Sequence, residues 1–191
     1  PLVTVEIPQS GFTTFYYSDQ SFLLPEGMEA YTIRQTTKGL QQGQHISMAG
    51  SVLTAGQAVV LKANPGVYEM VPTTETIAAD ARNRLRGSDV AELTRGGECY
   101  YRLTETDNGE LCWRWEEVDG GAFVNPAHKA YLASSKTEVP DEVLLGDVIT
   151  TICPMAADQS HTDATYNLAG QRVDKAYPSI VIQNGKKVWR R

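Results

Sequence analysis

Short strand-like runs, separated by turn residues, are the feature of this sequence that most limits what it can fold into. Each run is rich in β-branched and aromatic residues, which favour extended backbone. Phrases such as LLPEG and ANPG, which are typical of turns, stand between the runs. This spacing predicts an all-β protein, either a two-sheet sandwich or a barrel-like assembly. The runs lie at 3–7, 12–17, 30–35, 58–63 and 67–71.

One segment has the spacing of a helix instead. In TETIAADARNRLRG, at 74–87, Ile77, Ala81 and Leu85 recur every four residues. This spacing would place the three side chains on one helical face. We therefore expect a helical turn or two there.

An internal repeat emerges when Tyr31 is aligned with Tyr101. Few identities remain, but the order of features does: strand, glycine turn, strand, small-residue loop, buried strand. Chance similarity between two hairpins is the alternative interpretation. We favour a duplicated β unit. The other aligned landmarks are Gly39 with Gly109 and 53–61 with 124–132.

These patterns divide the chain into four parts. The first β unit is expected at 1–72 and the second at 99–150. The segment 73–98 connects them and holds the possible short helix. A linker and a small C-terminal β-hairpin unit are expected at 151–191.

The C-terminal stretch YNLAGQRVDKAYPSIVIQNGKKVW contains two short apolar runs, each broken by a small turn. Ala169-Gly170 is expected to turn the first hairpin and Asn184-Gly185 the second. An Asn-Gly pair favours the type I′ turn of a two-residue hairpin. The second hairpin then pairs Val181 with Val188 and Ile180 with Trp189. We expect its apolar strand to be buried against the preceding domain.

Composition limits the partners. The chain has 191 residues, of which 41% are hydrophobic, and 23 acidic residues outnumber 17 basic ones. This composition is typical of a globular protein and argues against a nucleic-acid partner. No apolar stretch reaches the ~20 residues of a membrane helix. Because the sequence begins at Pro1 without a methionine, we expect an upstream segment that holds any export signal.

No motif indicates catalysis or a cofactor. The three histidines, His45, His128 and His161, are scattered, and there is no GxSxG, HExxH or glycine-rich phosphate loop. Asp158 and Asp163 lie close to His161, but the surrounding Ser, Thr and Gln are typical of a linker. The sequence therefore predicts neither an enzyme nor a metal site.

The aromatic residues are the strongest candidates for a binding site. Trp113 and Trp115 lie two apart in CWRW, with Tyr101 and Tyr131 expected nearby. Flat rings on a strand face can stack on sugars, which would make these four residues a sugar platform. The alternative, which we favour, is that the same side chains form a core.

The hairpin CYYRLTETDNGELCWRWEEV tests this alternative. A three-residue loop, Asp107-Asn108-Gly109, makes Thr106 and Glu110 the closing pair and collects the large apolar side chains on one face. A two-residue loop would mix apolar and charged residues on both faces. We predict the three-residue loop, with the tryptophan face turned inward and no disulfide between Cys99 and Cys112. The pairs are Leu103 with Trp113 and Tyr101 with Trp115.

Several phrases follow one another in a familiar order: GFTTFYYSD, EAYTI, LTAGQAVVLKANPGVYEMV, NRLRGS, NPAHKAYL and YNLAGQRV...IVIQNGKKV. This order resembles that of secreted and surface proteins of Bacteroidetes, whose tail is close to YNLNGQRV...NGKKV. The tail is also similar to a truncated C-terminal sorting domain of the type IX secretion system. The resemblance implies an exported protein of a gut or oral bacterium, at the cell surface, in the periplasm or secreted. It implies no enzyme activity.

We therefore expect a non-catalytic, exported surface or adhesion-type β module. Its partner would be a surface protein or a glycan. The alternative is a carbohydrate-binding module that acts beside glycan-degrading machinery, and an enzyme ranks third.

Overall fold

The computed structural model describes residues 2–36, 39–135, 142–144, 165–167, 172–173, 180–183 and 186–189. The chain divides into two compact units, Pro1–Met155 and Ala156–Arg191. Every side chain whose burial is described belongs to the larger unit.

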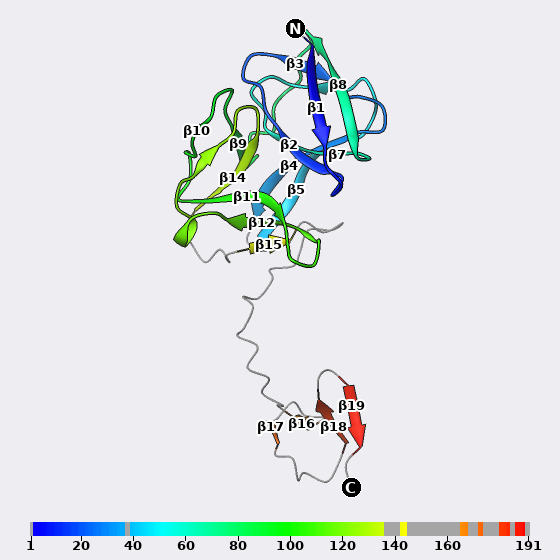
Figure 1. The fold of residues 1–191 in the computed structure, drawn as a ribbon, viewed down its shortest axis with the longest axis vertical. Helices are drawn as coiled ribbons and strands as arrows, with labels where there is room; N and C mark the ends of the chain where they lie inside the picture. The colour runs from blue at the N-terminus through cyan, green and yellow to red at the C-terminus, as the bar shows by residue number, and fades with distance from the viewer. Residues whose placement is uncertain are drawn as a thin grey trace. The chain divides into compact units, whose positions relative to one another are not determined.

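The larger unit consists of antiparallel sheets, which confirms the all-β prediction (Figure 1). None of these sheets closes on itself in the described part of the chain. Sheet I contains, in order, β1 (Val3–Ile7), β8 (Gly66–Thr73), β3 (Ser21–Leu23) and β6 (Val52–Leu53). Sheet II contains β2 (Phe12–Phe15), β7 (Val59–Lys62), β4 (Glu29–Thr36) and β5 (Gly39–Ile46).

The remaining strands of the larger unit form a third sheet and a ribbon. Sheet III contains, in order, β15 (Glu142–Leu144), β12 (Leu111–Trp115), β11 (Cys99–Glu105), β14 (Ala130–Ser134) and β9 (Leu85–Gly87). The ribbon pairs β10 (Glu92–Leu93) with β13 (Val124–Asn125). A single 3₁₀ turn, η1 (Val118–Gly120), follows β12.

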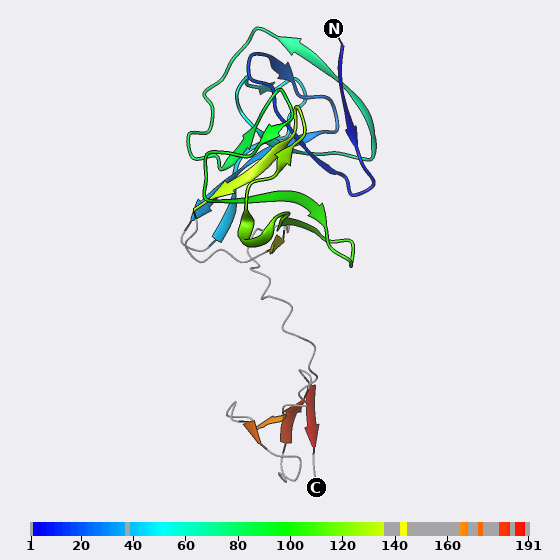
Figure 2. The same cartoon turned by 60° about the vertical axis from the view of Figure 1, so that its left-hand side comes forward.

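Sheet II is the central layer, because its two faces pack on different cores. One face meets sheet I around Phe22 and Leu61. The opposite face meets sheet III around Tyr31, Tyr101 and Trp113. Figure 2 shows the green strands of sheet III lying beside the blue and cyan strands of sheet II. This face-to-face packing is that of a β sandwich.

Sheets II and III share one strand order. Sheet II runs β2-β7-β4-β5, and sheet III runs β9-β14-β11-β12, with β15 added at its edge. Outside these sheets, β3 pairs with β6 as β10 pairs with β13. Successive strands from β2 to β7 therefore pair in the same way as those from β9 to β14.

The helix expected within 74–87 does not form, so that prediction was wrong. The segment lacks regular structure until it reaches strand β9. Ile77 is 41% exposed whereas Leu85 is 2% exposed, so the residues at helical spacing do not share a buried face. The Asn83 side chain donates to the Ala58 carbonyl and accepts from the Leu85 amide instead. These hydrogen bonds of Asn83 hold the segment in a non-helical conformation despite the helical spacing of its apolar residues.

The hairpin between β11 and β12 has the predicted three-residue loop. The Thr106 amide donates to the Glu110 carbonyl at 2.7 Å, and Gly109 has a φ of +79°. A left-handed glycine at this position is the one that such a loop requires. The pairs Tyr101 with Trp115 and Leu103 with Trp113 also match the prediction.

The register also separates the two described cysteines. Cys112 lies across from Thr104, on the β12 side of β11, whereas Cys99 pairs with Ser134 of β14. The two cysteines are both buried and are not joined to each other, as predicted.

The smaller unit is a four-stranded antiparallel sheet in the order β17-β16-β18-β19. Its last hairpin pairs Val181 with Val188 and Ile180 with Trp189, which confirms the predicted register. The expected turns at 169–170 and 184–185 and the side chains of the tail lie outside the described residues. The strands are β16 (Thr165–Asn167), β17 (Arg172–Val173), β18 (Ile180–Gln183) and β19 (Lys186–Trp189).

Within the described residues, no helix has the length and hydropathy needed to span a membrane.

Candidate functional site

A groove of about 480 Å³ lies between sheet II and sheet III. One wall is β2, an edge strand of sheet II, together with the turn that precedes it. The other walls are β11, β12 and the connection from β13 to β14. The lining mixes hydroxyl and apolar side chains with charged ones. Its uncharged members include Ser10, Phe12, Thr13, Leu103, Thr104 and Leu111.

Lys129 is one of the two cations among the described residues that line this groove. Its ammonium donates to the Thr13 hydroxyl at 2.7 Å, which ties the β13–β14 connection to β2. This is the one hydrogen bond of the ammonium within the described part of the chain, although an ammonium carries three donors. Burial lowers the pKa of Lys129 below its ordinary value, and the carboxylate of Glu6 opposes this shift. Lys129 therefore presents unused donors beside the groove.

Arg102 is the second cation of the lining, and its neighbours hold it in place. Its Nε donates to the Glu116 carboxylate, and its Nη2 donates to the Val124 carbonyl at 3.1 Å. The guanidinium carbon lies 4.7 Å from the centre of the Phe123 ring, a cation–π distance. This fixed geometry leaves the remaining guanidinium donors for a ligand.

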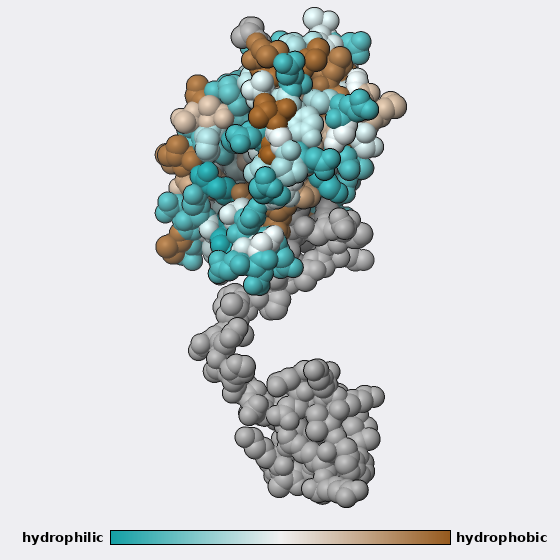
Figure 3. Space-filling view, turned by 45° about the vertical axis from the view of Figure 1, so that its right-hand side comes forward, coloured by the Kyte–Doolittle hydropathy of each residue, from teal (hydrophilic) through white to brown (hydrophobic). Residues whose placement is uncertain are grey.

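Apolar side chains flank the groove on the ribbon. Leu93 and Val124 oppose each other across β10 and β13, and they are 61% and 57% exposed. Val124 directly precedes Asn125, which lines the groove. On the face that Figure 3 shows, hydrophobic residues lie in separate patches among hydrophilic ones.

The four predicted aromatic residues do not form an exposed platform. Trp113 and Tyr101 are completely buried, and Tyr131 is 3% exposed. The Tyr131 hydroxyl is used internally, because it donates to the Arg95 carbonyl and accepts from the Arg95 amide. Trp115 is half-buried, with its ring centre 5.9 Å from that of Tyr101. These side chains serve as core, the alternative that we favoured.

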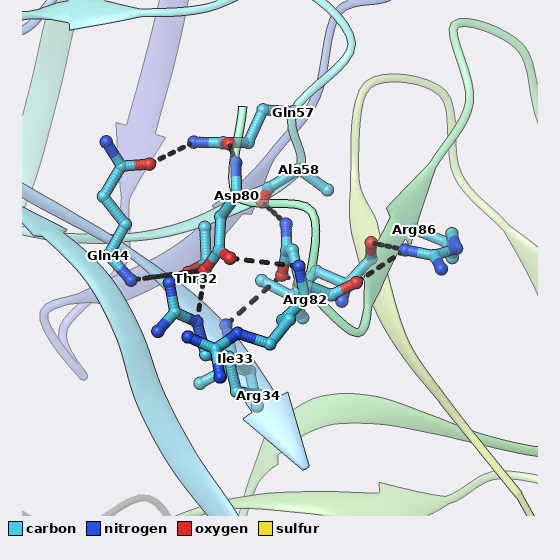
Figure 4. Close-up of polar contacts among 11 residues, drawn as sticks. Thr32, Ile33, Arg34, Gln44, Gln57, Ala58, Asp80, Arg82 and Arg86 are labelled. Carbon is cyan, nitrogen blue, oxygen red and sulfur yellow. Dashed lines mark hydrogen bonds and ion pairs between the residues drawn. The ribbon is translucent and has the colours of Figure 1, made fainter. Parts of the chain in front are cut away.

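A buried carboxylate, Asp80, is the centre of a second polar cluster (Figure 4). Its side chain is 3% exposed, and its Oδ2 accepts from the Thr32 hydroxyl at 2.6 Å and from the Arg34 Nε at 2.8 Å. The Gln44 amide donates to the Thr32 hydroxyl at 2.8 Å. The Asp80 amide donates to the Gln57 side chain. The cluster thus fastens the irregular segment before β9 to strands β4, β5 and to the start of β7.

The hydrogen bonds around Asp80 set its ionisation. Burial alone would raise its pKa, but the bonds from Arg34, Thr32 and the Arg82 amide outweigh burial. They hold the pKa of Asp80 well below its ordinary value. A carboxylate that is kept charged and fully bonded has a structural role here, because its accepting positions are occupied.

No group of three or more potential metal ligands occurs among the described residues. The candidate ligands Asp158, His161 and Asp163 lie outside them. His45 bonds to Glu29 at 2.8 Å, and His128 stacks on Tyr17 at 3.9 Å. Both histidines are therefore engaged with neighbouring side chains.

Sequence reasoning missed Lys129 and Arg102. Both lie within phrases that were used for the repeat, the hairpin register and the family resemblance. The signal available was a basic residue within or next to a strand in each phrase, HKAYL and YYRLT. That signal does not show that the two residues line one groove.

Comparison of the chain with protein-family models, with curated proteins and with solved structures finds no match.

Proposed function

We propose that this protein is a non-catalytic, adhesion-type binding module and that the groove between sheets II and III is its binding site. The observation that carries the proposal is the lining of the groove. It combines apolar side chains, hydroxyls and two cations, a mixture suited to holding part of a larger molecule. Among its described lining residues, Glu105 is the one carboxylate, and there is no histidine or cysteine. General acid–base catalysis relies most often on histidine or on paired carboxylates.

We also propose that the larger unit arose by duplication of a β unit. The shared strand order of sheets II and III supports this proposal. The cross-strand neighbours of the aligned tyrosines support it too. Tyr31 pairs with His45 and Val60, and Tyr101 pairs with Trp115 and Leu132. The groove would then lie at a junction between two related units.

Export to the cell surface is part of the same proposal. It rests on the resemblance of the chain to exported proteins of Bacteroidetes. Digestion of intact cells with a protease that cannot enter them is the measurement. Loss of the protein under these conditions is expected, and its survival until the cells are lysed would contradict surface display.

The binding site can be tested by filling the groove. Ser10 lines it, whereas its neighbour Gln9, on the same turn, is exposed and is not part of the lining. We expect Ser10→Trp to weaken binding at least about tenfold, because an indole would occupy the groove, whereas Gln9→Trp should bind as the unmodified protein does. Binding is measured by interferometry on immobilised fibronectin, collagen and mucin and on a glycan array.

Two results would contradict the proposal. Equal binding by Ser10→Trp and the unmodified protein would place the site elsewhere. Absence of binding to every member of the panel would argue against an adhesion-type module. A target restricted to neutral glycans and lost in Ser10→Trp would favour the carbohydrate-binding alternative.

A further inference from the structure

The strands that hold Asp80 have counterparts beside the groove. When Tyr31 is aligned with Tyr101, Thr32 corresponds to Arg102 and Arg34 to Thr104. On β4 the hydroxyl of Thr32 precedes the guanidinium of Arg34 by two residues. On the equivalent strand β11 the order is reversed, because the guanidinium of Arg102 precedes the hydroxyl of Thr104 by two residues. Residues two apart on a strand share a face.

The connection before the last shared strand extends this correspondence. Tyr31 pairs with Val60, and Tyr101 pairs with Leu132, so Gln57 corresponds to Lys129. The alignment of 53–61 with 124–132 differs from this register by one residue. The side-chain oxygen of Gln57 accepts a hydrogen bond from the backbone amide of Asp80 at 2.5 Å. Lys129 occupies the matching place in the wall of the groove. At one junction a hydroxyl, a guanidinium and an amide hold a peptide segment, and at the other a hydroxyl, a guanidinium and an ammonium line the groove.

The segment that precedes the edge strand differs between the two junctions. Ahead of β9, Asp80 reaches Thr32 and Arg34. The corresponding segment ahead of β2 is the turn at 8–11, closed by the Gly11 amide on the Pro8 carbonyl. This turn forms the opposite wall of the groove. No residue of it has a described bond to Arg102 or Thr104.

We propose that the groove binds an extended acidic peptide segment whose carboxylate lies against Arg102, Thr104 and Lys129, as the carboxylate of Asp80 lies against Thr32 and Arg34. The inference rests on the proposed function and names the class of its ligand. A carboxylate suits this wall because ammonium and guanidinium groups form strong, charge-assisted hydrogen bonds with it. The Thr104 hydroxyl adds a donor, and this hydroxyl makes no hydrogen bond that is described among residues 2–36 and 39–135.

Nearby acidic groups limit the strength of this site. Glu116 already binds Arg102, Glu105 lines the groove, and Glu6 lies close enough to affect Lys129. Lys129 is thus the cation with no carboxylate bonded to it within the described residues. We therefore expect most of the preference for acidic ligands to depend on Lys129.

The chain supplies its own probe for the experiment. The peptide IAADAR, residues 77–82, is acetylated and amidated so that Asp is its one carboxylate, and IAANAR is the matched peptide that lacks this carboxylate. Binding to the full chain is followed by the amide NMR shifts of residues around the groove. We expect the Asp peptide to bind at least about fivefold more tightly than the Asn peptide. Lys129→Met should abolish this preference.

Three variants separate function from folding. Lys129→Met keeps the apolar stem. It loses the hydrogen bond to Thr13 but also removes a partly desolvated charge, so the two effects offset each other and the melting temperature should change little. Thr104→Val preserves the shape of the side chain and should weaken the Asp peptide severalfold. Arg95→Gln removes one positive charge from an exposed position outside the groove and should change nothing.

The outcomes distinguish the two proposals. Equal binding of the Asp and Asn peptides, binding of neither, or an unchanged preference in Lys129→Met would overturn the acidic-peptide inference. Preferential binding of digalacturonate would overturn it in favour of an acidic glycan. If a panel target is lost in Ser10→Trp but retained in Lys129→Met, this inference fails while the proposed binding groove stands.

Discussion

Replacing Asp80 with asparagine should lower the free energy of unfolding by about 1.5 to 3 kcal/mol at pH 7, the range for hydrogen bonds to a charged group. The variant keeps the size of the side chain but removes the charge that Arg34 and Thr32 bind. The Arg34 side chain is 31% exposed, so water can solvate it and the loss stays below that of a fully buried pair. Chemical denaturation measures the effect.

The same variant has a pH signature. The pKa of Asp80 lies below its ordinary value of ~3.9 in the folded protein. Its contribution to stability is therefore fully present above that ordinary value. This contribution is lost as the pH falls from the ordinary pKa towards the pKa of the folded protein, because the unfolded state takes up the proton first. The difference in unfolding free energy between the unmodified protein and Asp80→Asn should stay constant down to about pH 5 and then shrink steadily towards pH 2.

Asp19 provides the matched control. It is exposed, and it makes no described hydrogen bond or ion pair. Asp19→Asn should alter the free energy of unfolding by less than about 0.5 kcal/mol. A difference between Asp80→Asn and the unmodified protein that is constant across the pH range would show that the carboxylate is not held charged as the structure implies.

Local sequence patterns predicted the hairpins because turn chemistry and alternation are short-range properties. Asn108-Gly109 and the alternation of large apolar side chains were enough to fix the register of β11 on β12. The same information predicted the burial of Trp113, since a face that collects several large apolar residues is more stable inside. The aligned tyrosines likewise pointed to two related units, and that division stays a prediction.

Long-range polar contacts were beyond such reasoning. Asp80 lies 48 residues from Thr32, and nothing in the sequence near either residue indicates that they bond. The spacing of Ile77 and Leu85 therefore suggested a helix, whereas Asp80 and Asn83 hold the segment in an irregular conformation with a turn at 80–83. Local patterns could not predict the groove either, because it involves a hydrogen bond between Lys129 and Thr13, which lie 116 positions apart.

Gly43 lies where the Asp80 cluster leaves no space for a side chain. A β-bulge interrupts the pairing of β4 with β5 between Tyr31 and Ile33, so that Gly43 and Gln44 lie opposite Thr32. A Cβ atom on Gly43 would lie 2.2 Å from the Thr32 hydroxyl and 2.6 Å from the Asp80 carboxylate. Both side chains are buried, so neither can move aside without losing a hydrogen bond.

Gly43→Ala should therefore lower the free energy of unfolding by about 2 to 4 kcal/mol, through overpacking and the displaced hydrogen bonds. Gly121→Ala is the control, because its Cβ would meet other atoms at an ordinary 3.4 Å, and it should change stability by less than about 0.5 kcal/mol. In an Asp80→Ala background, the added Cβ of Gly43→Ala no longer meets the Asp80 carboxylate, and the close contact with Thr32 remains. The Gly43→Ala loss should then shrink by more than about 0.5 kcal/mol, the coupling expected of residues in contact. Strict additivity of the two losses in denaturation would contradict the contact between Gly43 and the carboxylate.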